Sequence, residues 1–353
     1  MDRPRSLAPL ALGAALLPAC LTKTYEIDES FAESHAAFAV TKIAPVEGPQ
    51  GVALRPSAGE VLWLARGGWT ESSLAAAALD GDRTPRTVAE YSLASTTDDG
   101  LDRLVLDGTD AYWSVPADAG ATRRILSVSL TSPAEAAEVA TGVIGGAFDA
   151  AGGELYYATS PAGADDSGLR RLAGTTPTSL PLTRDGSPFV AVAAHGLRLR
   201  GASLYFWTSS ALYRVAAGGG AITTVATVDV SDLAFASDAV LFGILGYGGA
   251  ATSIDRVEVA TGEPESIAGD GWELFALPRV SPDGDALAFV VQASDCGSEQ
   301  IRVVPLDADR RPVGAPVLAV LGHCVTDLAL LGPAELVFTA SGPEPGVYHA
   351  RAR

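Results

Sequence analysis

The sequence has few of the side chains that bind nucleic acid. Only two of its 353 residues are Lys, none is Asn, and Lys and Arg together number 24 against 42 Asp and Glu. The formal net charge of −18 argues against nucleic acid as a partner, because phosphate binding needs clustered basic side chains. The lack of Asn also excludes sites of N-glycosylation.

Short enzyme motifs are absent as well. The chain has no GxSxG, no HExxH and no glycine-rich phosphate loop after a strand, which are signatures of hydrolases, zinc proteases and nucleotide-binding enzymes. Of the four His, His35 precedes the repeats described below, and His349 lies on a strand that we expect to face outward. His195 and His323 remain as candidates, and we assign no catalytic residue.

The chain begins with the pattern of an export signal. Arg3 and Arg5 precede an apolar run from Leu7 to Leu17, which is too short to span a bilayer comfortably. We expect residues 1–19 to be a signal peptide.

A lipid attachment motif follows this run. Leu17-Pro18-Ala19-Cys20 resembles the bacterial lipobox, whose cysteine is lipidated and becomes the new N-terminus. The resemblance implies a lipid on Cys20 and a tether at residues 20–37. Because residue 21 is Leu rather than Asp, it also implies the outer membrane as the destination of the protein. The alternative is a plain secretory peptide or a buried start of the fold.

One pattern recurs seven times along the chain: a short apolar strand, a Gly, Asp or Pro turn, and a strand that ends in an aromatic residue. The closing aromatic residues are Trp63, Trp113, Tyr157, Phe206, Phe242, Phe289 and Phe338. A third strand with alternating polarity follows in each unit. Repeats of this length and strand content are typical of propeller blades. The sequence therefore predicts an all-β fold, a single seven-bladed β-propeller of four-stranded antiparallel blades over residues 38–353.

The fourth strands predict how the ring closes. They share a short sequence with an apolar ending, as in RTVA, which ends at Ala89, and TTVA, which ends at Ala226. The seventh unit ends at Arg353 without such a sequence. Residues Thr41 to Ala44 have the same form and precede the first inner strand. We expect this N-terminal strand to complete the last blade, so that backbone hydrogen bonds join the seam of the ring.

Two of the repeats resemble those of known propellers. DGTDAYWSV from Asp107 is similar to the tyrosine-tryptophan repeats of bacterial propellers, and SPDGDALAFV from Ser281 is similar to the repeat of TolB-like propellers. The resemblance implies the fold over residues 38–353 and is unspecific for activity, because such repeats encode turns and packing.

Acidic residues gather in the loops that should share one face of the propeller. They are Asp98, Asp99, Asp102, Asp165, Asp166, Asp185, Asp229, Asp232, Asp270, Glu273, Asp295 and Glu299. This face is expected to be strongly negative, either as a solvated rim or as a cation-binding surface.

Alignment of the inner strands places five residues at the mouth of the central channel: Gln50, Asp102, His195, Asp232 and Asp327. Carboxylates that converge there suit a hard cation such as Ca²⁺. Our hypothesis is that Asp102, Asp232 and Asp327 bind Ca²⁺, and the alternative is that these side chains only cap strand ends in water.

Two cysteines follow the proposed anchor. Cys296 and Cys324 fall in loops on the same face of blades six and seven, and an oxidising compartment favours a disulfide between them. The alternatives are two reduced thiols, or a metal site with His323 that lacks a convincing fourth ligand.

Three aromatic residues in glycine-flanked loops are candidate contact anchors, unless they pack down onto their own loops: Trp69, Tyr247 and Trp272.

The sequence thus predicts a lipid-anchored monomer that recognises a protein, peptide or glycan through its acidic face. The alternative function is a metal-dependent hydrolase or lyase at the channel mouth, assembled from His195 with Asp102 or Asp232.

Overall fold

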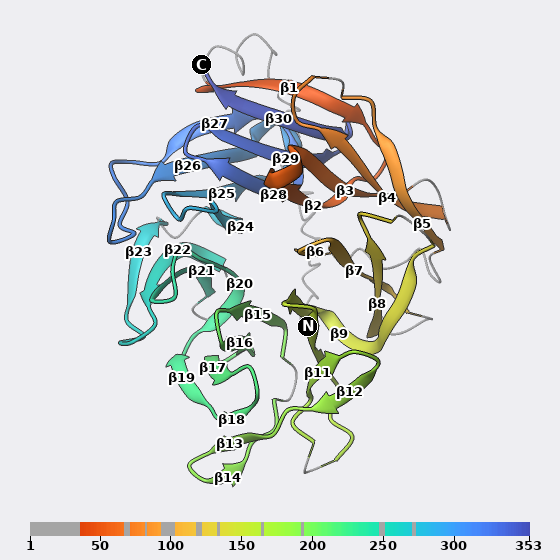
Figure 1. Ribbon diagram of the computed structural model, residues 1–353. Coiled ribbons are helices and arrows are strands. Elements are labelled where there is room, and N and C mark those ends of the chain that lie inside the picture. The colour runs from red at the N-terminus through yellow and green to blue at the C-terminus, as the bar shows by residue number, and fades with distance from the viewer. Residues whose placement is uncertain are drawn as a thin grey trace, which may run out of the picture.

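The computed structural model describes residues 36–66, 71–81, 83–92, 103–117, 122–132, 135–163, 166–191, 194–246, 251–269 and 273–353. Its sheets are arranged in a ring, with one strand of each sheet toward the centre (Figure 1). The chain forms an all-β, seven-bladed propeller of four-stranded antiparallel sheets, as predicted.

The blades follow the chain order. Blade 1 contains β2(Gln50–Arg55), β3(Glu60–Arg66), β4(Glu71–Ala78) and β5(Arg86–Ser92), and blade 2 contains β6(Leu104–Asp107), β7(Asp110–Pro116), β8(Thr122–Ser129) and the first part of β9(Ala137–Ala151). Blade 3 contains the second part of β9, β10(Glu154–Thr159), β11(Leu169–Ala173) and β12(Thr176–Ser179), and blade 4 contains β15(Gly196–Arg200), β16(Ser203–Trp207), β17(Leu212–Ala216) and β19(Thr223–Ala226). Blade 5 contains β20(Asp229–Phe235), β21(Val240–Gly246), β22(Ala251–Glu258) and β23(Pro264–Ala268). Blade 6 contains β24(Leu274–Val280), β25(Ala286–Gln292), β26(Gln300–Pro305) and β27(Val317–Leu321), and blade 7 contains β28(Cys324–Gly332), β29(Glu335–Ser341), β30(Gly346–Ala352) and β1(Phe38–Pro45).

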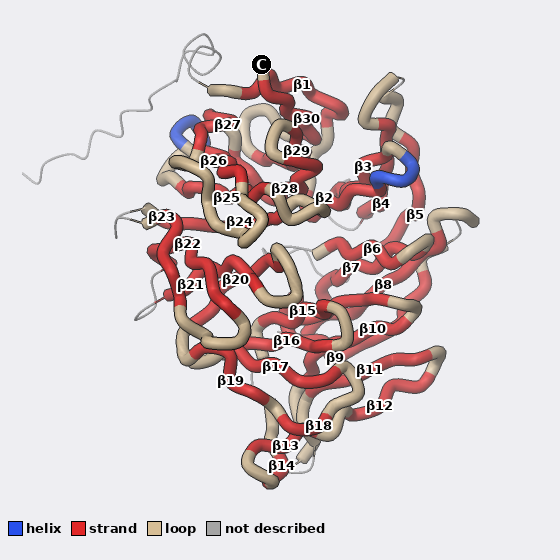
Figure 2. The backbone as a smooth tube through the Cα atoms, turned by 60° about the vertical axis from the view of Figure 1, so that its left-hand side comes forward, coloured by secondary structure: helices blue, strands red, loops and turns tan. Residues whose placement is uncertain are grey.

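A few elements lie outside the blades. A small sheet is made of β13(Leu182–Arg184), β14(Ser187–Pro188) and β18(Gly220–Ala221), and it extends from the ring below β17 and β19 in Figure 2. The helical turns of the described residues are η1(Pro56–Ala58) and η2(Cys296–Ser298), drawn in blue in Figure 2. Within the described part of the chain, no helix is long and apolar enough to cross a membrane.

Strand β9 belongs to two blades. Its first part pairs with β8, where Ile144 lies opposite Thr122, and its second part pairs with β10, where Ala151 lies opposite Glu154. Residues 137–140 (AEVA) have the ending typical of a fourth strand, but β9 continues past Ala140 to Ala151. The chain changes direction without a loop because Gly142 and Gly145 adopt φ angles of 68° and 51°, which residues with a Cβ rarely adopt.

Seven hydrophobic clusters hold the ring together, one between each pair of neighbouring blades. The seven closing aromatic residues are all buried within them. Six of these rings pack toward the preceding blade, but Phe242 of blade 5 lies in the cluster shared with blade 6. Leu241 takes its place in the cluster shared with blade 4, because a shift of one residue along a strand moves a side chain to the opposite face of the sheet.

Strand β1 completes blade 7, as predicted. It pairs antiparallel with β30, and Phe38 lies opposite Ala352 while Pro45 lies opposite Gly346 (Figure 1). The amide of Ala37 also donates to the carbonyl of Leu318 in blade 6, at 2.9 Å. The first and last strands of the propeller are therefore joined by backbone hydrogen bonds.

Replacing Ile43 tests this closure. Ile43 is 7% exposed and packs in the cluster between blades 7 and 1, so Ile43→Ala should lower the free energy of unfolding by about 3 kcal/mol. Thr41 lies exposed on the same strand, and Thr41→Ala should change it by less than about 0.5 kcal/mol. Urea denaturation measures both, and equal losses would show that β1 does not seal the ring.

Candidate functional site

Three of the five residues predicted at the channel mouth line one cavity. His195, Asp232 and Asp327 lie on the wall of a space of about 300 Å³ that is enclosed by the inner strands of blades 2 to 7. The backbone of Gln50 begins β2 opposite Leu64, whereas its side chain and the whole of Asp102 lie outside the described residues. We call this space the channel-mouth cavity.

The candidate contact residues Trp69, Tyr247 and Trp272, and the proposed lipid attachment residue Cys20, also lie outside the described residues. Their roles stay predictions.

One side of the channel-mouth cavity is apolar. Ile244, Phe275, Leu277 and Trp207 line it. The indole of Trp207 crosses β15 so closely that a Cβ at residue 196 would lie 1.9 Å from the ring atom Cζ2. Glycine at position 196 is therefore what allows the ring to lie there.

The lining also carries arginines next to these apolar residues. Arg103, Arg198 and Arg279 line the cavity beside Asp232 and Asp327. The guanidinium of Arg198 lies 5.4 Å from the centre of the Trp207 ring, a separation at which a cation and an aromatic face attract. The cavity thus combines an apolar wall with cationic hydrogen-bond donors.

These arginines belong to a ring of alternating charges around the channel, which we call the channel belt. One residue comes from each of blades 2 to 7, in the order Arg103, Asp149, Arg198, Asp232, Arg279 and Asp327. Nitrogen and oxygen atoms lie 3.2 Å apart in the pair Arg103–Asp149 and 2.8 Å apart in Arg198–Asp232, Arg279–Asp232 and Arg279–Asp327. The belt therefore links successive blades through charged side chains.

The carboxylates of the channel belt also bind backbone amides. In Asp149, Asp232 and Asp327, Oδ1 accepts from the amide of the following residue at 2.8 to 3.0 Å. Oδ2 of Asp149 accepts from the amide of Leu199 in blade 4 at 2.8 Å, and Oδ2 of Asp327 accepts from the amide of Val52 in blade 1 at 2.9 Å. Blade 1, which contributes no charged side chain to the belt, is thus joined to it through its backbone.

Mutual pairing keeps Asp232 and Arg279 ionised. Burial acts to raise the pKa of Asp232, but Arg279 and Arg198 outweigh burial, and the pKa falls below its usual value. Burial acts to lower the pKa of Arg279, but Asp327 and Asp232 outweigh it, and the pKa rises. Burial lowers the pKa of Arg103 to about 10, and repulsion from Arg198 adds to this effect. All three groups stay charged at neutral pH.

The belt changes the expectation of a Ca²⁺ site. Asp232 and Asp327 already pair with guanidinium groups, and the described residues contain no group of three His, Cys, Asp or Glu that could hold a metal ion. A cation would have to displace Arg279, which already occupies the space between the two carboxylates. We do not carry the Ca²⁺ hypothesis forward.

The expected negative face is partly neutralised in the same way. Among the described loop residues, Asp166 pairs with Arg170 at 2.6 Å and Glu273 pairs with Arg302 at 2.8 Å. Arginines on the adjacent strands therefore reduce the negative charge that the loops were expected to carry.

Among the described residues of the cavity, no side chain is placed to act as a general base. Although His195 is exposed beside Asp232 and Asp327, no hydrogen bond joins its side chain to another described residue. Asp232 is held ionised by two arginines, which makes it a weak proton acceptor. His349 is buried, at 2% exposure, against Glu335, contrary to the expectation that it faces outward.

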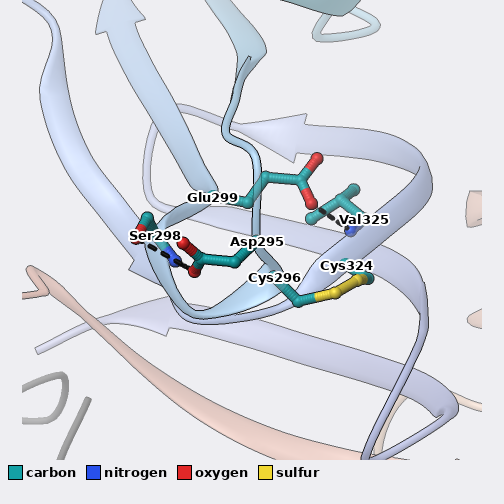
Figure 3. Close-up of a disulfide and its surroundings, with 6 residues drawn as sticks. All are labelled: Asp295, Cys296, Ser298, Glu299, Cys324 and Val325. Carbon is teal, nitrogen blue, oxygen red and sulfur yellow. Dashed lines mark hydrogen bonds between the residues drawn. A yellow bond between two sulfur atoms is a disulfide. The ribbon is translucent and has the colours of Figure 1, made fainter. Parts of the chain in front are cut away.

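The predicted disulfide is present. Cys296 and Cys324 are bonded, with Cα atoms 4.5 Å apart, and join the loop before β26 to the start of β28 (Figure 3). Their thiolates are thus not available to a metal, and His323 instead packs against the rings of Phe338 and Tyr348. The bond ties blade 6 to blade 7 on the cavity's face of the propeller.

Glu299 lies beside this disulfide. Its Oε2 accepts from the amide of Val325 at 3.1 Å (Figure 3). Burial raises the pKa of Glu299 to about 7, against the opposing effect of the Val325 hydrogen bond. The sequence pattern placed Glu299 among the acidic loop residues of this face but did not distinguish it from the others.

Solved β-propellers resemble the chain over most of its length. The C-terminal WD40 domain of Sif2 aligns with a TM-score of 0.53 and 11% identity over 90% of this chain and 99% of that domain. The β-propeller domain of Cps50 (Swd1) from Myceliophteria thermophila aligns with a TM-score of 0.59 and 11% identity, over 89% and 99%. The GH74 enzyme of Niastella koreensis aligns with a TM-score of 0.57 and 14% identity over 89% of this chain, which spans only 53% of that enzyme.

Comparisons with protein-family models and with curated proteins give no match. At identities of 11 to 14%, the likeness to solved structures shows the β-propeller fold alone.

Replacing Asp327 tests the channel belt. Asp327→Asn removes the charge that pairs with Arg279 and should lower the free energy of unfolding by about 3 kcal/mol, since it leaves a half-buried guanidinium with one partner fewer. Asp238 is 81% exposed and pairs with Arg200 outside the belt, so Asp238→Asn should cost at most about 1 kcal/mol. Urea denaturation compares the two, and similar losses would mean that the belt does not hold the blades.

The raised pKa of Glu299 predicts that the stability of the fold depends on pH. Its ordinary pKa of 4.5 rises to about 7 in the folded chain, so its contribution to stability is complete below pH 4.5 and is lost as the pH rises through 7. Glu299→Gln keeps an acceptor for Val325 but cannot ionise. The variant should melt at a higher temperature than the parent at pH 8 and at the same temperature at pH 4.

Glu263 is the control, because it is exposed in a loop. Thermal melts of Glu263→Gln should match the parent at both pH values. A Glu299→Gln variant that gains no stability at pH 8 would contradict the raised pKa.

Proposed function

We propose that the protein is an exported, lipid-anchored binding protein that recognises a protein, peptide or glycan at the channel mouth without covalent chemistry. The observation that carries this proposal is the channel-mouth cavity, which joins an apolar wall to fixed arginine donors. Cavities that are mainly apolar, with a few well-placed polar groups, are typical ligand sites.

The proposed anchor rests on the lipobox-like residues that end at Cys20, and a disulfide suits an oxidising compartment outside the cytoplasm. We propose the outer membrane as the destination and a monomer as the functional unit. The described chain begins at Ala36, next to the outer strand of blade 6. A tether joined at this point would start at the outer rim of the propeller.

The enzyme alternative lacks its chemistry in the described part of the cavity. A hydrolase or lyase needs a base near the reacting atom, whereas the carboxylates here are engaged by arginines and His195 has no orienting partner. Binding is therefore the function that the geometry favours.

Photocrosslinking on intact cells tests the proposal. The full chain carries a photoreactive p-benzoylphenylalanine in place of His195, at the cavity, or in place of Thr109, in an exposed turn at the opposite end of the channel. Irradiation should give a discrete adduct with the first variant and none with the second. Adducts of equal yield at both positions, or none at His195, would contradict recognition at the channel mouth.

The same cells test the anchor. The parent chain should sediment with membranes, and Cys20→Ser should move it to the soluble fraction, whereas the double variant Cys296→Ser, Cys324→Ser should stay with the membranes. A Cys20→Ser variant that remains membrane-bound would contradict the lipid anchor.

A further inference from the structure

The hydrogen-bonding capacity of the channel belt is unequal, and this inequality indicates what the cavity accepts. This inference rests on the proposed function, because it names the chemical group that the channel-mouth cavity binds.

The carboxylates of the belt are nearly saturated. Asp232 accepts three hydrogen bonds from described residues, namely Arg198, Arg279 and the amide of Leu233. Asp327 also accepts three, from Arg279 and the amides of Val52 and Leu328. Little acceptor capacity is left on either carboxylate for a ligand.

The guanidinium groups have N–H donors that form no hydrogen bond to a described residue. An arginine has five N–H donors. Arg198 uses two of them on described residues, for the carbonyl of Leu197 and for Asp232. Arg279 uses three, for Asp232, Asp327 and the carbonyl of Pro278. Both arginines therefore keep N–H groups for a hydrogen-bond acceptor in the cavity that they line.

The unused donors of Arg198 and Arg279 are charged. The channel belt as a whole is balanced, with three arginines against Asp149, Asp232 and Asp327. The preference for an anion therefore comes from the donors themselves, because a charged donor makes its strongest hydrogen bonds to a charged acceptor. An anionic acceptor is thus favoured over a neutral one.

The apolar wall restricts the anion further. Phe275 and Trp207 pack in the clusters between blades, at 3% and 2% exposure, and their edges line the same cavity as Arg198 and Arg279. The anion should therefore carry an apolar group that meets these edges. The volume of about 300 Å³ lies at the lower end of the range for ligand sites and suits one or two residues of a peptide.

We propose that the channel-mouth cavity binds a carboxylate joined to an apolar group, as found at the C-terminus of a peptide. The carboxylate lies against Arg198 and Arg279, and the apolar side chain of the last residue lies against Phe275 and Trp207. A free small acid of the same chemistry is the other source of such a ligand.

Isothermal titration calorimetry on the full chain tests this assignment. The probes are the peptide acetyl-Gly-Gly-Leu-Phe as the free acid, the same peptide as the C-terminal amide, and 3-phenylpropionate. The free acid should bind, and the amide should bind at least about tenfold more weakly, because it loses charge-assisted hydrogen bonds to arginine. Equal binding of acid and amide, or no binding of either, would overturn the proposal.

The source of the carboxylate follows from the third probe. If 3-phenylpropionate binds as tightly as the peptide acid, the carboxylate chemistry holds and the ligand is a small acid. If it binds more weakly than the peptide acid, the chemistry holds and the ligand is a chain end.

A matched pair of variants locates the site. Arg198→Gln should weaken the peptide acid about tenfold, and Asp232 keeps Arg279 as a partner, so that the fold survives. Arg200→Gln, two residues further along β15 and paired with exposed Asp238, should leave the affinity unchanged. Thermal melts confirm that both variants are folded, and a folded Arg198→Gln variant with parental affinity would overturn the assignment.

Failure here is distinguishable from failure of the proposed function. A crosslink at His195 together with equal binding of acid and amide would support recognition at the channel mouth. It would contradict only the assignment of a carboxylate ligand.

Discussion

The ion pairs of the channel belt are the interaction on which the centre of the propeller depends. Each hydrophobic cluster joins only two neighbouring blades, and apolar packing by itself is non-directional. Arg279 bonds blade 6 to both Asp232 of blade 5 and Asp327 of blade 7. Half-buried ion pairs add little net stability when their desolvation is counted. We therefore interpret the belt as fixing the position of the inner strands, which in turn sets the shape of the cavity.

The repeating features of this fold were predictable from the sequence. Aromatic residues such as Trp63 and Phe338 recur because every blade must bury a ring between sheets, and that requirement appears as a period along the chain. The strand at Thr41 was recognisable because the last repeat lacked a fourth strand. Cys296 and Cys324 could be paired because both fall in loops on one face of neighbouring blades. Each of these predictions follows from the repeated strand pattern and from the order of the repeats along the chain.

The belt was not predictable in the same way. Arg198 and Asp232 are separated by 34 residues, and a period shows where their strands lie but not which charges meet across the channel. Alignment of the inner strands grouped the aspartates without the arginines and so predicted a cation site. The signal that could have revealed the arginines is local, since Arg198 and Arg279 lie within inner strands that are mostly apolar, and Arg103 directly precedes another. The packing of Phe242 toward blade 6 was not predictable, because a shift of one residue in blade 5 leaves the spacing almost unchanged.

The most direct measurement of the belt's role is a double-mutant cycle between Arg279 and Asp232. The free energy of unfolding is measured by urea denaturation for the parent, Arg279→Gln, Asp232→Asn and the double variant. Groups that act as a coupled pair at the channel should give an interaction energy of about 1 to 3 kcal/mol. Losses that add within about 0.5 kcal/mol would contradict the claim that the belt holds the inner strands in place.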